Sequence, residues 1–203
     1  MANFVHLHVH SEFSLLDGLG KLDQLIARTK EMGMDTLAIT DHGAMYGSFK
    51  FYLKAKAAGI KPIIGVETYV ARRSRLDKEG KIDTDPYHLV LLAQNDVGYR
   101  NLLKLVTSAH LDGYYYKPRI DWDLLTQHHE GIICLSACLA GQVPQLLLQD
   151  KMREAEEVAK KYAQLFGPDH YYIELQKHPA IAEIEIVNEK LIALSRKLGL
   201  PLV

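Results

Sequence analysis

Three histidines alternate with apolar residues near the start of the chain. His6, His8 and His10 recur with a period of two. Because alternate side chains of a β-strand point to opposite faces, this period predicts a strand over residues 4–10 with the three imidazoles on one face. Imidazoles are costly to bury unless they bind something, and neutral imidazole is a common metal ligand. We therefore expect a metal site here; the alternative is a surface strand with incidental histidines.

The composition limits the class of protein. The chain has 203 residues, 48% of them hydrophobic, which suits one domain with a sizeable core. A net charge of −1 argues against a chain-wide nucleic-acid surface, although not against a local one. The two cysteines fit a reducing compartment. Without a signal-peptide pattern or an apolar run of about 20 residues, we expect a soluble, cytoplasmic protein that does not contact a membrane.

Apolar runs alternate with helical patterns along the rest of the chain. The runs predict strands at 36–40, 62–67, 88–93, 131–136 and 171–175, and residues 200–203 resemble the start of a seventh strand. Helical spacing predicts helices at about 21–33, 49–57, 97–111, 143–148, 151–166 and 180–198. This alternation predicts βα units and a parallel sheet. The charged segment 72–86 is expected to be a solvated excursion.

Ligand-type side chains gather around the ends of these predicted strands, where α/β enzymes place their sites. The candidates are His8, His10, Asp17, His42, Glu67, His88 and Cys138. Such a donor set suits zinc and also admits manganese or iron. Paired metals activate water and clamp the oxygens of a phosphoryl group. No serine or cysteine nucleophile with a nearby base is evident, so we expect water to be the attacking group.

Position supports these candidates unequally. Asp17 lies in an Asp-Gly pair that is more often only a turn, and His88 precedes its apolar run instead of following it. Cys138 alone is more often a core residue. We expect His6 to lie behind the ligands and Cys134 to pack in the core.

Several runs of sequence resemble the polymerase and histidinol phosphatase (PHP) superfamily, namely His6–Ser11, Thr40–Gly43 and Gly65–Glu67. Longer runs, including Tyr115–Trp122 and Gly131–Ser136, are similar to the N-terminal domains of bacterial DNA polymerase III α subunits. The resemblance covers essentially the whole chain. It implies one PHP domain over residues 1–203, with an α/β fold of the PHP type: a distorted (β/α)7 barrel, here truncated at the start of its seventh strand.

The same resemblance implies a cluster of up to three divalent metals, which would be zinc, manganese or iron. The ligands would be His8, His10 and Glu67 for the first, Asp17 and His42 for the second, and Glu67, His88 and Cys138 for the third. Asp41, next to His42, is expected to be a catalytic residue. Two further ligands would follow Val203, so we expect a gap between the first and sixth strands and the tightest metal binding at the third position.

The implied function is that of a PHP domain in a replicative DNA-directed DNA polymerase, with a metal-dependent phosphoesterase or 3′–5′ proofreading exonuclease site. The implied partners are DNA, as a single-stranded 3′ end or primer–template, and other polymerase III holoenzyme subunits, including a proofreading exonuclease. Lys117 and Arg119 are candidates for DNA contact or for a solvated loop. Two alternatives remain: a free-standing phosphatase of the histidinol-phosphatase type, and a non-catalytic scaffold that docks the proofreading subunit.

Overall fold

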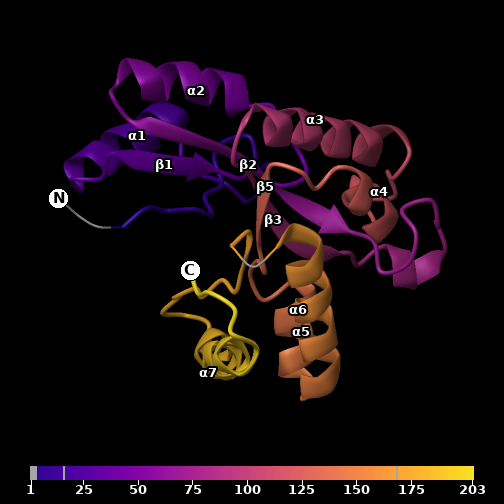
Figure 1. The fold of residues 1–203 in the computed structure, drawn as a ribbon. Helices are drawn as coiled ribbons and strands as arrows, with labels where there is room; N and C mark the ends of the chain where they lie inside the picture. The colour runs from indigo at the N-terminus through magenta and orange to yellow at the C-terminus, as the bar shows by residue number, and fades with distance from the viewer. Residues whose placement is uncertain (1–3, 16, 168) are drawn as a thin grey trace.

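The computed structural model describes residues 4–15, 17–167 and 169–203, and within them six strands form one sheet (Figure 1). The strands are β1 (Thr36–Ile39), β2 (Lys61–Val70), β3 (Tyr87–Ala93), β4 (Arg119–Ile120), β5 (Ile132–Leu135) and β6 (Tyr171–Tyr172). The α-helices are α1 (Leu22–Glu31), α2 (Ser48–Ala57), α3 (Asp96–Leu111), α4 (Trp122–Gln127), α5 (Gln142–Leu148), α6 (Met152–Phe166) and α7 (Ala182–Leu198). None of the described helices is both long and apolar enough to cross a membrane.

The sheet is mixed: the expected parallel pairing is confirmed for β1–β2, β2–β4 and β5–β6, and it is wrong for β3. The strand order is β1-β2-β3-β5-β6, with β4 beside β2, and β3 runs antiparallel to both β2 and β5. The reason lies in the charged segment 72–86, which contains only a short 3₁₀ turn at Gly80–Asp83. A parallel connection usually needs a helical crossover, whereas this segment returns the chain to the end of β2 that it has just left.

The predicted first strand is also wrong as a regular strand. Residues 4–10 are extended but bend at His8, and no strand is assigned to them. They nevertheless lie beside β1, because Ala38 N donates to His6 O at 3.1 Å and Thr40 N donates to Val9 O at 2.8 Å. The Thr40 hydroxyl accepts from the Val9 N–H, so a side chain replaces part of the strand ladder. The period of two therefore indicated an extended backbone but not regular pairing.

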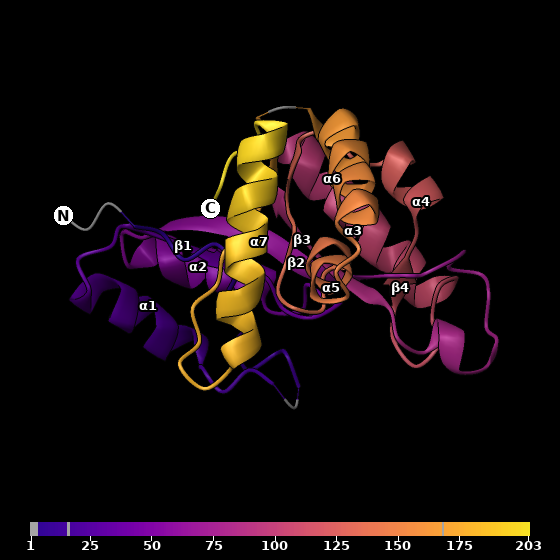
Figure 2. The ribbon, with the colours of Figure 1, turned by 90° about the horizontal axis from the view of Figure 1, so that it is seen from below.

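The helices cover one face of the sheet. Leu37 and Ile39 of β1 pack in one cluster with residues of α1 and α2, whereas Ala38 between them belongs to a cluster on the opposite face. Leu91 of β3 lies opposite Cys134 of β5, and both belong to the largest cluster, which includes residues of α3, α6 and α7. In Figure 1, α2 and α3 lie above the strands and α5 to α7 below them, and Figure 2, seen from below, shows α5 and α7 in front of β2 and β3. Because both groups of helices pack on the same face, the sheet curves between them. Cys134 packs in the core, as expected.

The second face of the sheet is the inner one. It carries Ala38, Val90, Leu92 and Leu135, with Leu7 packed against them. One helix-covered face and one inner face are what a barrel-type sheet has, whereas a doubly wound sheet carries helices on both faces. The described strands form an open sheet, so the expected barrel is confirmed only as a mixed α/β architecture and not as a closed one.

A cavity of about 460 Å³ lies between the two ends of the sheet. Its lining includes Phe4–His8 from the start of the chain, Glu174–His178 after β6, and Val203. The last residues lie beside the continuation of β6: Ile173 pairs with Leu202 in a parallel bridge, and Val203 N donates to Ile173 O at 3.0 Å. The cavity therefore lies where we expected the gap between the first and sixth strands.

Candidate metal centre

Five parts of the chain bring the candidate ligands to one end of the inner face. Glu67 on β2 lies opposite Val90, which is an inner-face residue, and a parallel bridge joins Glu67 to His42 just after β1. The antiparallel direction of β3 explains the position of His88. Its strand begins where β2 ends, so a residue at the start of the apolar run reaches the same edge as residues at the ends of β1 and β2. A bridge between His88 and Gly141 then brings the segment after β5, with Cys138, to this edge.

The Glu67 carboxylate is the centre of the group. It is 1% exposed, and four imidazoles surround it. Its Oε2 lies 2.7 Å from His42 Nδ1 and 3.0 Å from His10 Nε2. Its Oε1 lies 3.0 Å from His88 Nδ1 and 3.3 Å from His8 Nε2. One carboxylate therefore contacts nitrogen atoms from three separate parts of the chain.

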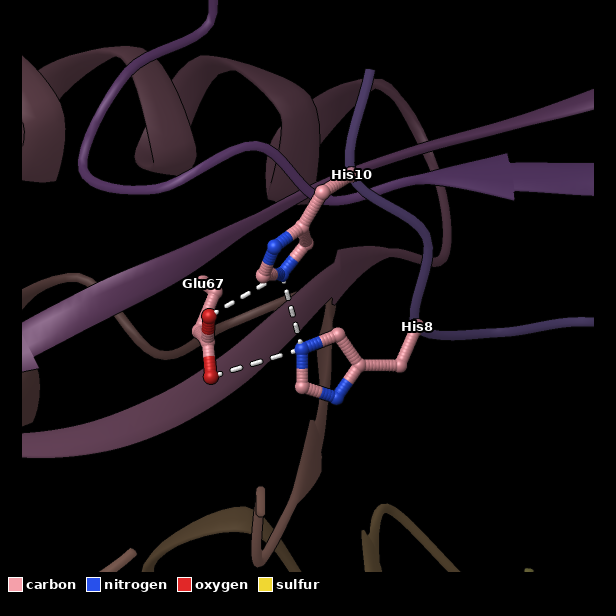
Figure 3. A group of neighbouring side chains, drawn as sticks. All are labelled: His8, His10 and Glu67. Atoms are coloured by element: carbon pink, nitrogen blue, oxygen red, sulfur yellow. Dashed lines mark hydrogen bonds and ion pairs between the residues drawn. The ribbon is translucent and has the colours of Figure 1, made fainter. Parts of the chain in front are cut away.

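His8 and His10 turn the same nitrogen toward each other and toward Glu67 (Figure 3). Their Nε2 atoms are 3.1 Å apart. Two ligands at roughly 2.0–2.1 Å from a tetrahedral zinc ion are separated by roughly 3.3 Å, so this spacing is the one that a shared ion requires. The two residues are two positions apart in the extended segment, and their side chains point to the same side, as the period of two predicted.

Asp17 and Cys138 extend the group in opposite directions. The Asp17 carboxylate contacts His10 Nδ1, and its Oδ2 lies 3.2 Å from His42 Nε2. Cys138 Sγ lies 3.6 Å from Glu67 Oε1 and 3.7 Å from His88 Nδ1. Among the described residues, three sets present ligand atoms within 4.8 Å of one another, namely His8, His10 and Glu67; His10, Asp17 and His42; and His42, Glu67 and His88. The structure thus brings together all seven side chains that the sequence singled out, with Cys138 beside the third set.

The electrostatics of the centre are dominated by Glu67 and its histidines. Burial acts to raise the pKa of Glu67, but its close contacts with His10, His42, His8 and His88 outweigh burial and hold the pKa well below its usual range. Burial acts to lower the pKa of His8, and its contacts with Glu174 and Glu67 reverse this and raise the pKa to about 10. Burial and the Glu67 charge raise the pKa of the Cys138 thiol to about 12.

Two buried atoms of the centre show that the residues fit a cation. His42 Nδ1 and Glu67 Oε2 approach to 2.7 Å, but neither makes a hydrogen bond of acceptable geometry with any described residue. A buried polar atom without a partner costs free energy, and a shared ion would satisfy both atoms at once. The donor set of imidazoles, carboxylates and one thiol is that of zinc, and without the thiol it also suits manganese or iron.

Asp41 is the one predicted site residue that lies apart from the converging ligand atoms. It is 3% exposed; its Oδ1 accepts from Ser11 N at 2.6 Å and Ser14 Oγ at 2.7 Å, and its Oδ2 accepts from Ser11 Oγ at 2.9 Å. The same Ser14 hydroxyl accepts from His42 N at 3.1 Å. Asp41 therefore hydrogen-bonds the loop that leads to Asp17 to the segment that follows β1. Its catalytic role stays a prediction.

Two residues of the centre were not predicted from the sequence. The Tyr69 ring stacks on His42, with the ring centroids 5.7 Å apart and an interplanar angle of 11°. Glu174 Oε1 lies 2.7 Å from His8 Nδ1. Glu174 directly follows the apolar residues 171–173, as Glu67 directly follows residues 62–66 at the start of β2, so a carboxylate directly after an apolar run was the available signal. His6, expected behind the ligands, contacts Phe4 edge to face and is not part of the three described sets of converging ligand atoms.

Comparison with known proteins agrees with this geometry. Residues 6–178 match the PHP domain family. Two sequence relatives are the DNA polymerase III subunits alpha of Treponema pallidum, 54% identical, and Borreliella burgdorferi, 48% identical, with 99% of this chain covered in each case. A third, from Aquifex aeolicus, is 45% identical over 99% of this chain. The chain spans about a sixth of the length of these relatives, with 17% of the first two and 18% of the third covered.

Two solved structures share the fold at low sequence identity. One is an amidohydrolase from Chromobacterium violaceum, with a TM-score of 0.55, 14% identity, and coverage of 98% of this chain and 84% of that one. The other is a candidate metal-dependent phosphoesterase from Bifidobacterium adolescentis, with a TM-score of 0.57, 13% identity, and coverage of 98% and 86%. From the family match and the extent of the sequence similarity, the chain belongs to the PHP domain family and is homologous to the PHP region of bacterial DNA polymerase III α subunits.

Proposed function

We propose that residues 1–203 form the PHP domain of a replicative DNA polymerase α subunit and that its metal centre hydrolyses phosphoester bonds at the 3′ end of DNA. The observation that carries this proposal is the convergence of His8, His10, His42 and His88 on the Glu67 carboxylate. A buried acid with four imidazoles has no evident role in folding, because an apolar side chain of similar size would avoid the cost of burying the charge.

The proposed metal positions share Glu67. The first would use His8, His10 and Glu67, and the second His10, Asp17 and His42. The third would use His88 with Glu67 and Cys138. Zinc, manganese or iron held here would supply Lewis-acid activation of water and charge compensation for a phosphoryl group.

The protein's own side chains would hold and shape this site. Glu67 would keep the positions close together, because its two oxygens face different histidines. Asp17 is the most exposed of the proposed ligands, with 54% of its side chain accessible, so the DNA end would approach from its side. Asp41 would act as the catalytic residue proposed from the sequence or would hold the Asp17 loop, and the metal content and hydrolysis of Asp41→Asn separate these two roles.

The partners and location follow from the relatives and are part of the same proposal. DNA would enter as a single-stranded 3′ end or a primer–template, and other polymerase III holoenzyme subunits, including a proofreading exonuclease, would contact the same subunit. Replication also implies a cytoplasmic location. The relatives are about six times longer than this chain, which supports a domain of a larger subunit over a free-standing histidinol-phosphatase-like enzyme.

The test is hydrolysis of a 5′-labelled single-stranded oligonucleotide by the purified protein, with manganese or zinc added. We expect shortening from the 3′ end that is lost on His10→Ala. His128→Ala is the matched control, since His128 is the C-cap residue of α4 and belongs to none of the described sets of converging ligand atoms. Cleavage that persists in His10→Ala would contradict the proposal. Hydrolysis of histidinol phosphate but not DNA would favour the phosphatase, and metal uptake without any hydrolysis would favour a scaffold.

A further inference from the structure

A second buried carboxylate contacts the metal centre through His8. Glu174, which follows β6, is 5% exposed, and its Oε1 lies 2.7 Å from His8 Nδ1. The other nitrogen of this ring, Nε2, faces Glu67 at 3.3 Å and His10 at 3.1 Å (Figure 3). The ring of His8 therefore lies between two carboxylates, of which only Glu67 belongs to the proposed metal ligands.

The contact with Glu174 determines which nitrogen of His8 is available to a metal. A carboxylate oxygen accepts hydrogen bonds and does not donate them, so His8 Nδ1 carries the proton in this contact. Loss of the remaining proton then leaves the lone pair on Nε2, which is the atom that faces His10 and Glu67. Ligating histidines commonly donate their other N–H to a carboxylate, which orients the ring and makes the ligand more basic.

Glu174 is itself held in place from two sides. Gln176 Nε2 donates to Glu174 Oε1 at 2.7 Å, and the Glu174 backbone N–H donates to Ser136 Oγ at 2.9 Å. Gln176 Nε2 also lies 3.2 Å from His8 Nδ1, but both groups are donors in this arrangement, so each of them points to the carboxylate instead. These contacts fix Glu174 on the side of His8 that is remote from Glu67.

The burial of Glu174 is not explained by the fold alone. Its Oε2 makes no hydrogen bond with any described residue, and no described lysine or arginine forms an ion pair with it. Burying a carboxylate without a full set of partners costs free energy. By contrast, Glu156, which is also buried, forms an ion pair with Lys197. The side chains that hydrogen-bond to Glu174 are His8 and Gln176, so its placement is explained by what it does to His8.

We propose that Glu174 is a positioning residue that holds the His8 ring by its Nδ1–H group and presents Nε2 to the metal shared with His10 and Glu67. This inference rests on the proposed metal centre, and it adds a residue that ligates no metal itself. Gln176 supports the same task by orienting the Glu174 carboxylate.

The test uses metal affinity and a spectroscopic readout of His8. Glu174→Leu removes the acceptor, Glu174→Gln keeps an acceptor oxygen but removes the charge, and Glu156→Gln is the matched control at a buried carboxylate away from the site. Zinc affinity is measured by competition with a chromophoric chelator, and the metal content by mass spectrometry. In zinc-loaded protein labelled with ¹⁵N-histidine, NMR reports whether His8 Nδ1 carries a hydrogen-bonded proton.

We expect Glu174→Leu to weaken one zinc equivalent about 10- to 100-fold and to lose the protected Nδ1 proton signal of His8. Glu174→Gln should keep the signal and weaken zinc binding less, and Glu156→Gln should change neither. If Glu174→Leu does not fold, loss of affinity in Glu174→Gln and Gln176→Leu carries the test. An Nδ1-bound metal, or unchanged zinc affinity in both Glu174 variants, would overturn the inference. If His8→Ala also left metal uptake unchanged, the proposed metal position would be wrong as well.

Discussion

Replacing Arg119 by lysine should destabilise the protein strongly, although the substitution keeps the charge. The Arg119 side chain is fully buried, and its guanidinium donates to four backbone carbonyl groups. Nε donates to Gly113 O at 3.0 Å and Nη1 to Asp83 O at 3.1 Å, while Nη2 donates to Arg75 O and Asp77 O, both at 2.8 Å. Arg119 thus attaches the charged segment 72–86 to the start of β4, and it is not available for contact with DNA.

The expected magnitude follows from the geometry of the two side chains. A lysine ammonium group placed at the Nη2 position could keep the bonds to Arg75 O and Asp77 O, but it cannot reach the other two carbonyl groups. Two lost charge-assisted hydrogen bonds at about 1.5 kcal/mol each give a loss of about 3 kcal/mol in the free energy of unfolding. For a chain of this length that corresponds to a fall of about 6–12 °C in the melting temperature.

Urea and thermal unfolding followed by circular dichroism measure this loss. The matched control is Arg100→Lys on α3, where the side chain is exposed and the change should stay within about 0.5 kcal/mol. A loss below about 1 kcal/mol for Arg119→Lys would contradict this prediction, because it would mean that one point charge replaces the four directed bonds.

Three further predictions concern titration and the loop before Asp17. Burial acts to raise the pKa of Asp121, but the backbone N–H groups of Arg75 and Leu124 and the Arg75 guanidinium lower it. The Asp121 carboxylate therefore contributes to stability above its ordinary pKa of 3.8, and this contribution is lost as the pH falls through the lowered pKa. In urea unfolding, wild type should exceed Asp121→Asn by roughly 1–3 kcal/mol at pH 7, and the difference should shrink below about pH 4; a constant difference would contradict this. Asp41→Asn should weaken the metal that uses Asp17 by roughly tenfold if Asp41 holds the loop, whereas full metal uptake with hydrolysis abolished would support a catalytic Asp41. Because the pKa of His8 is raised to about 10 in the metal-free protein, metal binding should release protons and weaken as the pH falls from 8 to 6; calorimetric heats that do not depend on the buffer would refute this.

The sequence predicted the helices and the candidate ligands better than it predicted the sheet. The amphipathic pattern over 151–166 corresponds to α6, Met152–Phe166, because a buried stripe at helical spacing is a local signal. Strand direction is not local, since an apolar run buried on both faces reads the same in either direction. Two signals did point to the antiparallel β3: the segment 72–86 lacks a helical pattern, and His88 comes before the apolar run of its strand instead of after it.

The candidate site likewise contains residues that local sequence signals indicated and residues that they did not. His8 and His10 were recognisable from their period of two, and Glu67 from its place directly after the apolar residues that begin β2. Glu174 was not singled out, although it also directly follows a short apolar run, because its contact with His8 spans 166 residues of sequence and cannot be predicted from the residues around it. The role of Arg119 was also hidden, since a buried arginine and a solvated one look alike in a loop of aromatic and basic residues.

The proposed metal centre depends on the Glu67 carboxylate being shared by its metals. The most direct test is the metal content of protein loaded with zinc or manganese and freed of excess ion, measured by mass spectrometry for wild type, Glu67→Gln and the control Glu156→Gln. We predict more than one equivalent for wild type and for Glu156→Gln. For Glu67→Gln we predict at most one, held by His10, Asp17 and His42. Less than one equivalent in wild type, or an undiminished content in Glu67→Gln, would contradict the claim.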